Sequence, residues 1–158
     1  LVVSVTMIHA GTADNIIPET AYLGGTVRTF DKDVKAMVKS RMAEIVAGQA
    51  ASFGVEAVLR YEEGFPATVN APKQTEFAVE VAREVAAEGR VVDDATREMG
   101  AEDFAYFLEK TPGSYLFVGN GDTAGLHQPD FDFDDATAPF GASFFARIAE
   151  RALPLGDA

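Results

Sequence analysis

Hydrophobic and polar residues alternate at the start of the chain with the period of a β-strand. In residues 1–8, valine and methionine occupy one face, and serine and threonine occupy the other, which predicts a strand half-exposed to water. Residues 22–30 predict a second strand, weakened or bulged at Gly24 and Gly25. Only a short loop separates the two strands, so we expect them to pair antiparallel.

A helical period replaces this alternation at about residue 33. Asp31 or Asp33 can cap the start of the helix, and Gly54 stands where it would end. Residues 55–61 alternate again and predict a third strand. The order strand, strand, helix, strand is that of a ferredoxin-like βαββαβ sandwich without its first strand and first helix. The apolar stripe of the helix consists of Val34, Met37, Val38, Met42, Ile45 and Val46.

Residues 64–73 contain two prolines, a glycine and an asparagine, and are the best candidate for a linker. Helices and short strands alternate after it, which indicates an α/β layer. We therefore divide the chain into two parts, residues 1–66 and residues 67–158. In the second part we expect helices at about 74–88, 102–109 and 137–153, and short strands near 91–92 and 114–118.

Composition excludes several classes of function. The chain has 13 basic and 25 acidic residues, a net charge of −12, which would repel phosphate backbones, so we expect no nucleic-acid partner. It has no cysteine, which excludes disulfides, thiolate metal ligands and a cysteine nucleophile within it. No run approaches the ~18 apolar residues of a membrane span, and we expect a cytoplasmic protein with no membrane partner. The start inside a strand, without methionine, indicates a fragment.

Three polar residues of the first two-thirds of the chain have both a structural and a functional interpretation. Asn15, near Pro18, suits an Asx-type turn between two strands. Arg28 on a strand suits a surface cation, although its planar fork could also grip a carboxylate in two places. Glu102 near a helix start suits the helix macrodipole.

His127 is one of only two histidines, and it follows a short apolar stretch within a glycine-rich loop. Loops at strand ends are where α/β sheets place their ligands, and an imidazole there suits zinc or manganese. The chemistry of the residue alone leaves metal ligation and a structural role equally open. The other histidine, His9, fits a solvent-facing or core-edge position better than a ligand position.

Taken together, three blocks resemble the aminoacylase and glutamate-carboxypeptidase family of two-metal peptidases. The first is residues 11–18 (Gly-Thr-Ala-Asp-Asn-Ile-Ile-Pro) with residues 25–28 (Gly-Thr-Val-Arg). The others are residues 99–104 (Met-Gly-Ala-Glu-Asp-Phe) and residues 126–129 (Leu-His-Gln-Pro). The similarity is strongest to the amidohydrolase branch, which includes hippurate hydrolase and the hydrolases of indoleacetyl-amino acid conjugates.

The resemblance implies a fold and a set of site residues. Residues 1–66 would be the end of a ferredoxin-like lid that often mediates dimerisation, and residues 67–158 the end of the α/β catalytic domain. The complete enzyme would hold two divalent metal ions (manganese, zinc or nickel), with His127 as a ligand. Asn15 and Arg28 match lid residues that bind the substrate carboxylate or scissile carbonyl, in some members in the partner subunit's active site. Glu102 lies in a motif of the branch and is included as a substrate-binding candidate.

The resemblance also places the remaining metal ligands and the general-base glutamate upstream of this chain. We therefore expect no catalytic residue within it, and expect the isolated chain to be inactive. The implied reaction is metal-dependent hydrolysis of the amide bond of an N-acyl-amino acid, a small hippurate-like substrate, by a homodimer joined through its lid. The alternatives are a dipeptidase or ureido-acid amidohydrolase of the same family, or a non-catalytic dimerisation or binding module that uses an exposed sheet edge.

Overall fold

The chain divides into two compact units, which are described separately. The computed structural model describes residues 1–154. One unit consists of Leu1–Ala67 with Glu98–Glu102, and the other of Thr68–Arg97 with the residues from Asp103 onward. Among residues 1–154, no helix is both long enough and apolar enough to cross a membrane.

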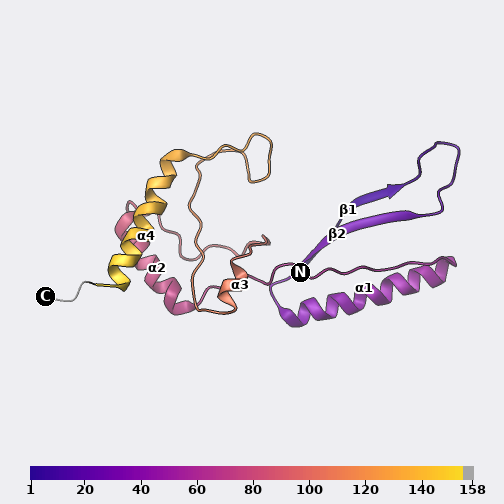
Figure 1. Cartoon of the computed structure of the whole chain (residues 1–158), viewed down its shortest axis with the longest axis horizontal. Coiled ribbons are helices and arrows are strands. Elements are labelled where there is room, and N and C mark those ends of the chain that lie inside the picture. The colour runs from indigo at the N-terminus through magenta and orange to yellow at the C-terminus, as the bar shows by residue number, and fades with distance from the viewer. Residues whose placement is uncertain (155–158) are drawn as a thin grey trace. The chain divides into compact units, whose positions relative to one another are not determined.

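The first unit begins with a β-hairpin. Strands β1 (Val2–Ala10) and β2 (Ala21–Arg28) pair antiparallel, as the alternation predicted, and Figure 1 shows the ten-residue connection at the far end of the pair. The pairing runs from Val2 opposite Arg28 to Ala10 opposite Ala21. Most residues of the two strands are exposed, so the ladder of backbone hydrogen bonds is the main support of the hairpin.

The two glycines of β2 lie opposite an irregularity in β1. The register shifts between Val5 and Met7, which face Gly25 and Gly24, so β1 has one residue more than β2 at this point. A Cβ atom on Gly25 would lie 2.0 Å from the carbonyl oxygen of Ser4, a separation that no side chain can adopt. The sheet is therefore irregular at the two glycines, as predicted, but the extra residue lies in β1 and not in β2. The close backbone approach at Gly25 requires glycine.

Helix α1 (Lys32–Phe53) has both of the predicted ends. The side chain of Asp31 accepts hydrogen bonds from the backbone N–H groups of Asp33 (2.8 Å) and Val34 (2.9 Å). Gly54 ends the helix in the left-handed conformation, with φ 64°, and its N–H donates to the last-turn carbonyls. Two local signals thus set the length of the helix.

The apolar stripe of α1 is only partly covered. Val38 is 5% exposed, and Val34 and Met42 on either side of it are half-buried, as is expected for residues four positions apart. Met37 and Ile45, which belong to the same predicted stripe, are 50% and 53% exposed. The buried row is therefore narrower than the sequence pattern indicated.

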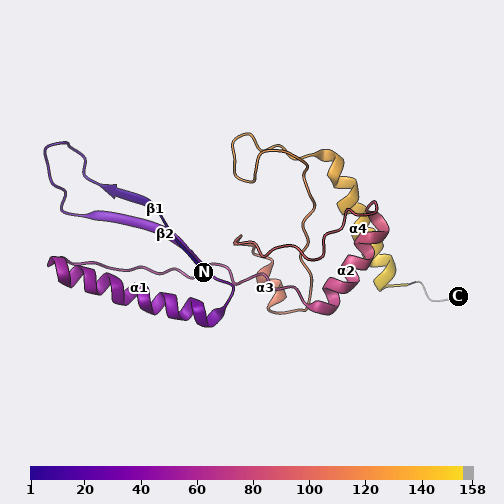
Figure 2. The ribbon, with the colours of Figure 1, turned by 180° about the vertical axis from the view of Figure 1, so that it is seen from behind.

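The third strand expected at residues 55–61 is not formed, and that prediction was wrong. After α1 the chain returns beside the helix as an extended segment, visible from both sides in Figures 1 and 2, without joining the two-stranded sheet. Glu63 forms ion pairs with Lys35 (2.6 Å) and Lys39 (2.8 Å), and the Lys39 ammonium lies 5.1 Å from the centre of the Tyr61 ring. Side chains rather than a backbone ladder attach this segment to the helix.

The second unit is centred on two packed helices. Helix α2 (Pro72–Val85) packs against α4 (Ala138–Ala152), and both begin with proline in the first turn, where its missing N–H is tolerated. Val81 of α2 is fully buried and Ala78 is 2% exposed. These two residues of α2 lie in the core of the unit. The observed boundaries of the two helices lie within three residues of those expected.

Ion pairs surround the contact between α2 and α4. Glu84 accepts a hydrogen bond from Arg147 (2.6 Å) and another from Arg151, whose second nitrogen reaches Glu80 (3.3 Å). The hydrogen bond from Arg147 holds the pKa of Glu84 below its ordinary value. The Arg151 guanidinium also lies 5.9 Å from the centre of the Phe77 ring, so it contributes both charge and packing.

The remaining expectations for the second unit were wrong in part. The helix expected at 102–109 is reduced to α3 (Ala105–Leu108), and neither residues 91–92 nor residues 114–118 form a strand. In the last of these stretches, the side-chain amide of Asn70 accepts from the backbone N–H of Tyr115 (2.8 Å) and donates to its carbonyl (2.9 Å). The amide bonds to that residue as a neighbouring strand would.

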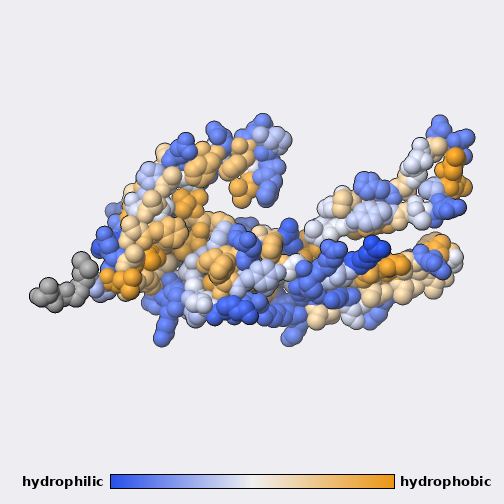
Figure 3. Space-filling view, in the orientation of Figure 1, coloured by the Kyte–Doolittle hydropathy of each residue, from blue (hydrophilic) through white to orange (hydrophobic). Residues whose placement is uncertain are grey.

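Many large apolar side chains remain on the surface. Figure 3 shows apolar side chains over the face of the helix pair and at the tip of the hairpin. Exposure reaches 94% at Ile17, 71% at Phe145 and 76% at Phe117, which lies in the stretch expected to be a strand. Burial alone therefore stabilises either unit only weakly.

Two glycine substitutions should have opposite effects on stability. Gly25→Ala places a methyl group against the β1 backbone and should lower the free energy of unfolding by about 1–3 kcal/mol, the usual range for overpacking. Gly48→Ala in the interior of α1 meets no atom within 4 Å and should raise it by about 0.5–1 kcal/mol. Urea denaturation followed by circular dichroism measures both. Equal effects of the two changes would contradict the close approach at Gly25.

The attachment of the segment after α1 should depend on pH. Hydrogen bonds from Lys35 and Lys39 lower the pKa of Glu63 from 4.5 to about 2. Because the carboxylate is favoured in the folded state, its stabilisation is complete above pH 4.5 and is lost as the pH falls towards 2. The effect should weaken with salt, since these side chains are half-exposed. Unfolding measured against pH in wild type and Glu63→Gln checks this, and a variant that keeps the whole wild-type acid dependence would disprove it.

Candidate functional site

His127 lies on a turn in a long loop of the second unit. The turn spans residues 125–128 and is closed by a hydrogen bond from the N–H of Gln128 to the carbonyl of Gly125 (3.2 Å). A second turn follows at once, closed by the N–H of Phe131 and the carbonyl of Gln128 (3.1 Å). The His127 side chain is exposed, and therefore accessible to a ligand from outside the loop.

The backbone of His127 is left-handed. Its φ is 66°, and within residues 1–154 it is the only residue other than glycine with a positive φ. An L-residue in this region costs roughly 1–2 kcal/mol, although histidine occurs there more often than most side chains do. Strain of this kind is common where a side chain must point in a defined direction.

Asn120 closes the base of this loop, and it was not among the site residues predicted from the sequence. Its amide nitrogen donates to the carbonyl of Asp132 (2.7 Å) and to the Thr123 hydroxyl (3.1 Å), and its amide oxygen accepts from the N–H of Asp134 (2.7 Å). The Asn-Gly dipeptide at 120–121 signals a turn, and Gly121 has a φ of 79°. The signal predicts the turn but not the hydrogen bonds to Asp132 and Asp134, which are 12 and 14 residues away.

The other end of the loop leads into α4. Asp134 caps the short 3-10 helix η1 (Asp135–Thr137) by accepting from the N–H of Ala136 (2.9 Å). The Thr137 hydroxyl donates to the carbonyl of Asp134 (2.8 Å), and α4 begins at the next residue. The loop that carries His127 is thus joined at its base to the helix pair of the second unit.

A cavity of about 480 Å³ opens at the base of the loop, and it is acidic. His127 is not among the residues that line it. In the described part of the chain, no group of three or more His, Cys, Asp or Glu side chains is arranged to hold a metal ion. The donor set of these residues therefore fits a single imidazole ligand at His127, not a complete metal site. The lining residues are Asn120, Gly121, Asp122, Thr123, Asp132, Phe133, Asp134 and Asp135.

Asn15 and Arg28 lie at opposite ends of the hairpin. Arg28 is the last residue of β2 and pairs with Val2, whereas Asn15 is exposed in the connection between the strands. The eight residues of β2 alone span roughly 24 Å at the rise of an extended strand. The structure therefore does not bring the two candidate substrate-binding residues together. Their roles stay predictions.

The other two residues with a possible functional interpretation lie in the first unit. Glu102 is half-buried, three residues before the start of α3, so it is not in the first turn of a helix. His9 is on β1 opposite Tyr22, and the two rings are stacked with centroids 6.1 Å apart. This cross-strand pair accounts for His9 without a ligand.

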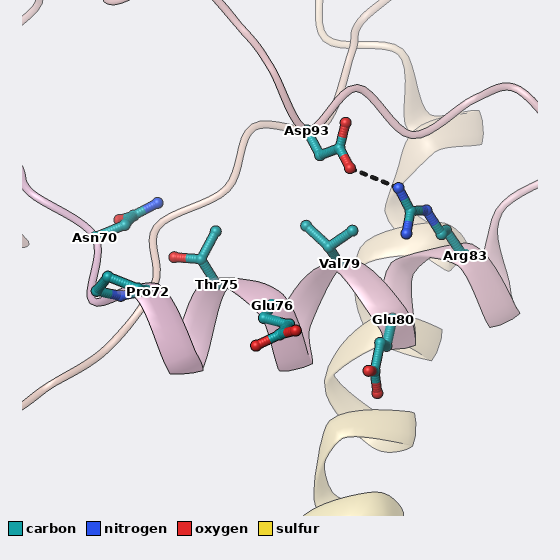
Figure 4. A pocket seen from close by; sticks show the side chains of 8 residues that line it. All are labelled: Asn70, Pro72, Thr75, Glu76, Val79, Glu80, Arg83 and Asp93. Carbon is teal, nitrogen blue, oxygen red and sulfur yellow. Dashed lines mark hydrogen bonds and ion pairs between the residues drawn. The ribbon is translucent and has the colours of Figure 1, made fainter.

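The larger of the two cavities described here lies along α2, within the second unit. It measures about 620 Å³, and Figure 4 shows its lining, with an ion pair between Arg83 and Asp93 (2.5 Å) across one end. Its only basic side chain is engaged by that ion pair, and it contains no histidine. None of the residues predicted for the site lines it.

Replacing His127 should reveal the strain in its turn. Glycine adopts a φ of 66° freely and alanine does not, so His127→Gly should be more stable than His127→Ala by about 1 kcal/mol. Both variants remove the imidazole, which makes them a matched pair. Urea denaturation of the two proteins gives the difference. Equal stabilities would show that residue 127 is not held in the left-handed conformation.

The chain is similar to several proteins named as carboxypeptidases and deacetylases. It is 33% identical over 154 residues to thermostable carboxypeptidase 1 of Saccharolobus solfataricus, covering 94% of this chain and 38% of that protein. It is 34% identical to the N-acetylcysteine deacetylase of Bacillus subtilis, and the match covers 94% of this chain and 38% of that protein. It is also 34% identical to the N-acetyldiaminopimelate deacetylase of Streptococcus sanguinis, where the match covers 88% of this chain and 37% of that protein. The chain therefore spans less than two-fifths of the length of these relatives.

The fold comparison agrees with the sequence comparison. The crystal structure of the Bacillus subtilis YXEP protein, described as a dinuclear metal-binding peptidase of the M20 family, superimposes with a TM-score of 0.79 at 34% identity. The similarity covers 96% of this chain and 42% of that one. It confirms the mixed α/β class expected from the sequence. Residues 5–151 also match the profile of peptidase family M20/M25/M40, and the chain belongs to that family.

Proposed function

We propose that this chain is the C-terminal section of a metal-dependent amidohydrolase that cleaves the amide bond of N-acyl-amino acids. The observation that carries the proposal is His127, an exposed imidazole held on a strained turn inside a segment that matches the family. The names of the relatives support the substrate class, because a carboxypeptidase and an N-acetyl-amino acid deacetylase both cleave an amide on the nitrogen of an amino acid.

His127 is the residue of this chain that would hold a metal ion. Two divalent ions, manganese, zinc or nickel, would supply a water of lowered pKa for attack on the amide carbonyl. The name of the YXEP neighbour supports a dinuclear centre. The remaining ligands and the general base belong to residues outside this chain, so we assign no catalytic residue within it.

Arg28 is the residue that we assign to the substrate carboxylate. It is half-buried at the end of β2, where the ladder to Val2 fixes its backbone. A guanidinium grips a carboxylate through two parallel hydrogen bonds, which suits a substrate that ends in a free amino acid. Asn15 lies at the opposite end of the hairpin, so it would not bind the same small substrate as Arg28 of its own chain, and we assign it to the scissile carbonyl in the partner subunit's active site. Glu102 remains a substrate-binding candidate without an assigned group.

The hairpin of the lid supports the proposal that the complete protein is a homodimer. The hairpin is exposed on both faces and has free strand edges, which suits pairing between two copies of a lid. We therefore propose a cytoplasmic homodimer that acts on a small molecule, with no nucleic-acid or membrane partner. The net charge of −12 supports the first of these exclusions.

The experiment uses the full-length protein that contains this chain, supplied with manganese, zinc or nickel. We expect turnover of N-acyl-amino acids such as N-benzoylglycine in preference to dipeptides or ureido acids. Arg28→Ala should raise KM about tenfold or more by removing a charged hydrogen-bond pair, and Arg28→Lys should recover only part of the loss. Steady-state kinetics over the panel measure both effects.

Two results would overturn the proposal. Hydrolysis of N-benzoylglycine by the 158-residue chain alone would show that the residues assigned elsewhere are unnecessary. A full-length protein that forms a compact dimer on size-exclusion chromatography but never binds metal would favour a non-catalytic dimerisation module. Preference for a dipeptide or a ureido acid would keep the family and change the substrate.

A further inference from the structure

The side chain of Asn120 joins the two ends of the His127 loop. All three of the hydrogen bonds described for Asn120 use its amide group, with the nitrogen bound to Asp132 and Thr123 and the oxygen to the N–H of Asp134. Asn120 therefore ties the outgoing and returning parts of the loop together. His127 lies between these two points, seven residues after Asn120 and seven before Asp134.

We propose that Asn120 is a positioning residue for His127, and this inference rests on the proposed role of His127 as a metal ligand. Without the amide, the segment 121–133 would be tied to α4 only at its returning end, through Asp134 and η1. Its many conformations would then compete with the one that presents the imidazole. Metal ligands must be held within about 0.5 Å of the productive geometry, so the loop needs a fixed base.

The chain contains a matched comparison for this clamp. Asn70 also bonds through both atoms of its amide, to the N–H and carbonyl of Tyr115, and it lies in the same unit. Its partner is 12 residues before His127, on another segment. Removing either amide takes away hydrogen bonds to the backbone and should destabilise the protein. Only removal of Asn120 should alter the presentation of His127.

The experiment measures metal affinity and loop protection separately in the full-length protein. Dissociation constants for Mn²⁺ and Zn²⁺, from competition with a chelator, are compared for wild type, Asn120→Ala, Asn70→Ala, His127→Ala and the Asn120→Ala/His127→Ala double variant. Asn120→Ala should weaken binding about tenfold or more, the usual effect of removing a residue that orients a ligand. Asn70→Ala should leave the dissociation constant unchanged.

The double variant tests whether Asn120 acts through His127. If it does, Asn120→Ala should weaken binding no further once the imidazole is gone. In metal-free protein, Asn120→Ala should also speed hydrogen exchange of the amides at 125–131, and Asn70→Ala should not. Equal effects of the two asparagine variants on affinity, additive effects in the double variant, or unchanged exchange at 125–131 would each overturn the inference.

Other results would show that the proposed function itself is wrong. A wild-type protein that binds no metal, or a His127→Ala variant that binds as tightly as wild type, would remove His127 from the metal site. The exchange measurement decides separately whether Asn120 fixes the loop. Urea denaturation of both asparagine variants supplies the stability control, since each should unfold at lower urea than wild type.

Discussion

Outside its helices, the second unit has no strand ladder in its described residues, so short turns and side chains supply hydrogen bonds to its backbone. Every buried N–H and C=O group requires a hydrogen-bond partner, and helices supply these partners locally. Outside α2 and α4 the long irregular segments use two asparagine amides, Asn70 on Tyr115 and Asn120 on the His127 loop. An amide carries both a donor and an acceptor, so it can bond to a backbone segment in the way that a neighbouring strand does. The paths of these segments depend on those two residues.

Electrostatic contacts are prominent in this chain because few apolar side chains are buried. Within residues 1–154 the apolar side chains that are nearly fully buried are few: Val38, Ala78, Val81 and Ala105. Burial of this extent supplies little of the free energy that a chain of this size needs. The charged groups along α2 and α4, and those between α1 and Glu63, therefore have a larger share in holding the segments together than they would beside a deep core. The stabilisation that these charged groups provide is sensitive to pH and salt.

Local signals in the sequence predict part of this structure well. Asp31 and Gly54 mark the ends of α1 because capping involves residues only two to four positions apart. Proline at the start of α4 and the alternation in the hairpin act over similarly short distances. The expected strands at 55–61, 91–92 and 114–118 failed for the opposite reason. A strand exists only when another segment pairs with it, and alternation in one segment cannot show whether that partner is present.

In the candidate site, too, local signals are visible in the sequence and long-range contacts are not. His127 stands out in the sequence as an imidazole in a glycine-rich loop, but its φ of 66° and its clamp do not. The Asn-Gly dipeptide indicates a turn at 120, and nothing local shows that the same amide reaches Asp132 and Asp134.

Hydrogen bonds hold the His127 loop in place without a metal ion. A mobile loop, in contrast, would be ordered only when the metal binds. The conformational entropy of the His127 loop is lost during folding, before any ligand arrives, so less of the binding energy is consumed in fixing the imidazole. The strain at His127 is then a cost of folding, offset by hydrogen bonds such as those of Asn120, and in the metal site that we propose the histidine would be in place before the other ligands.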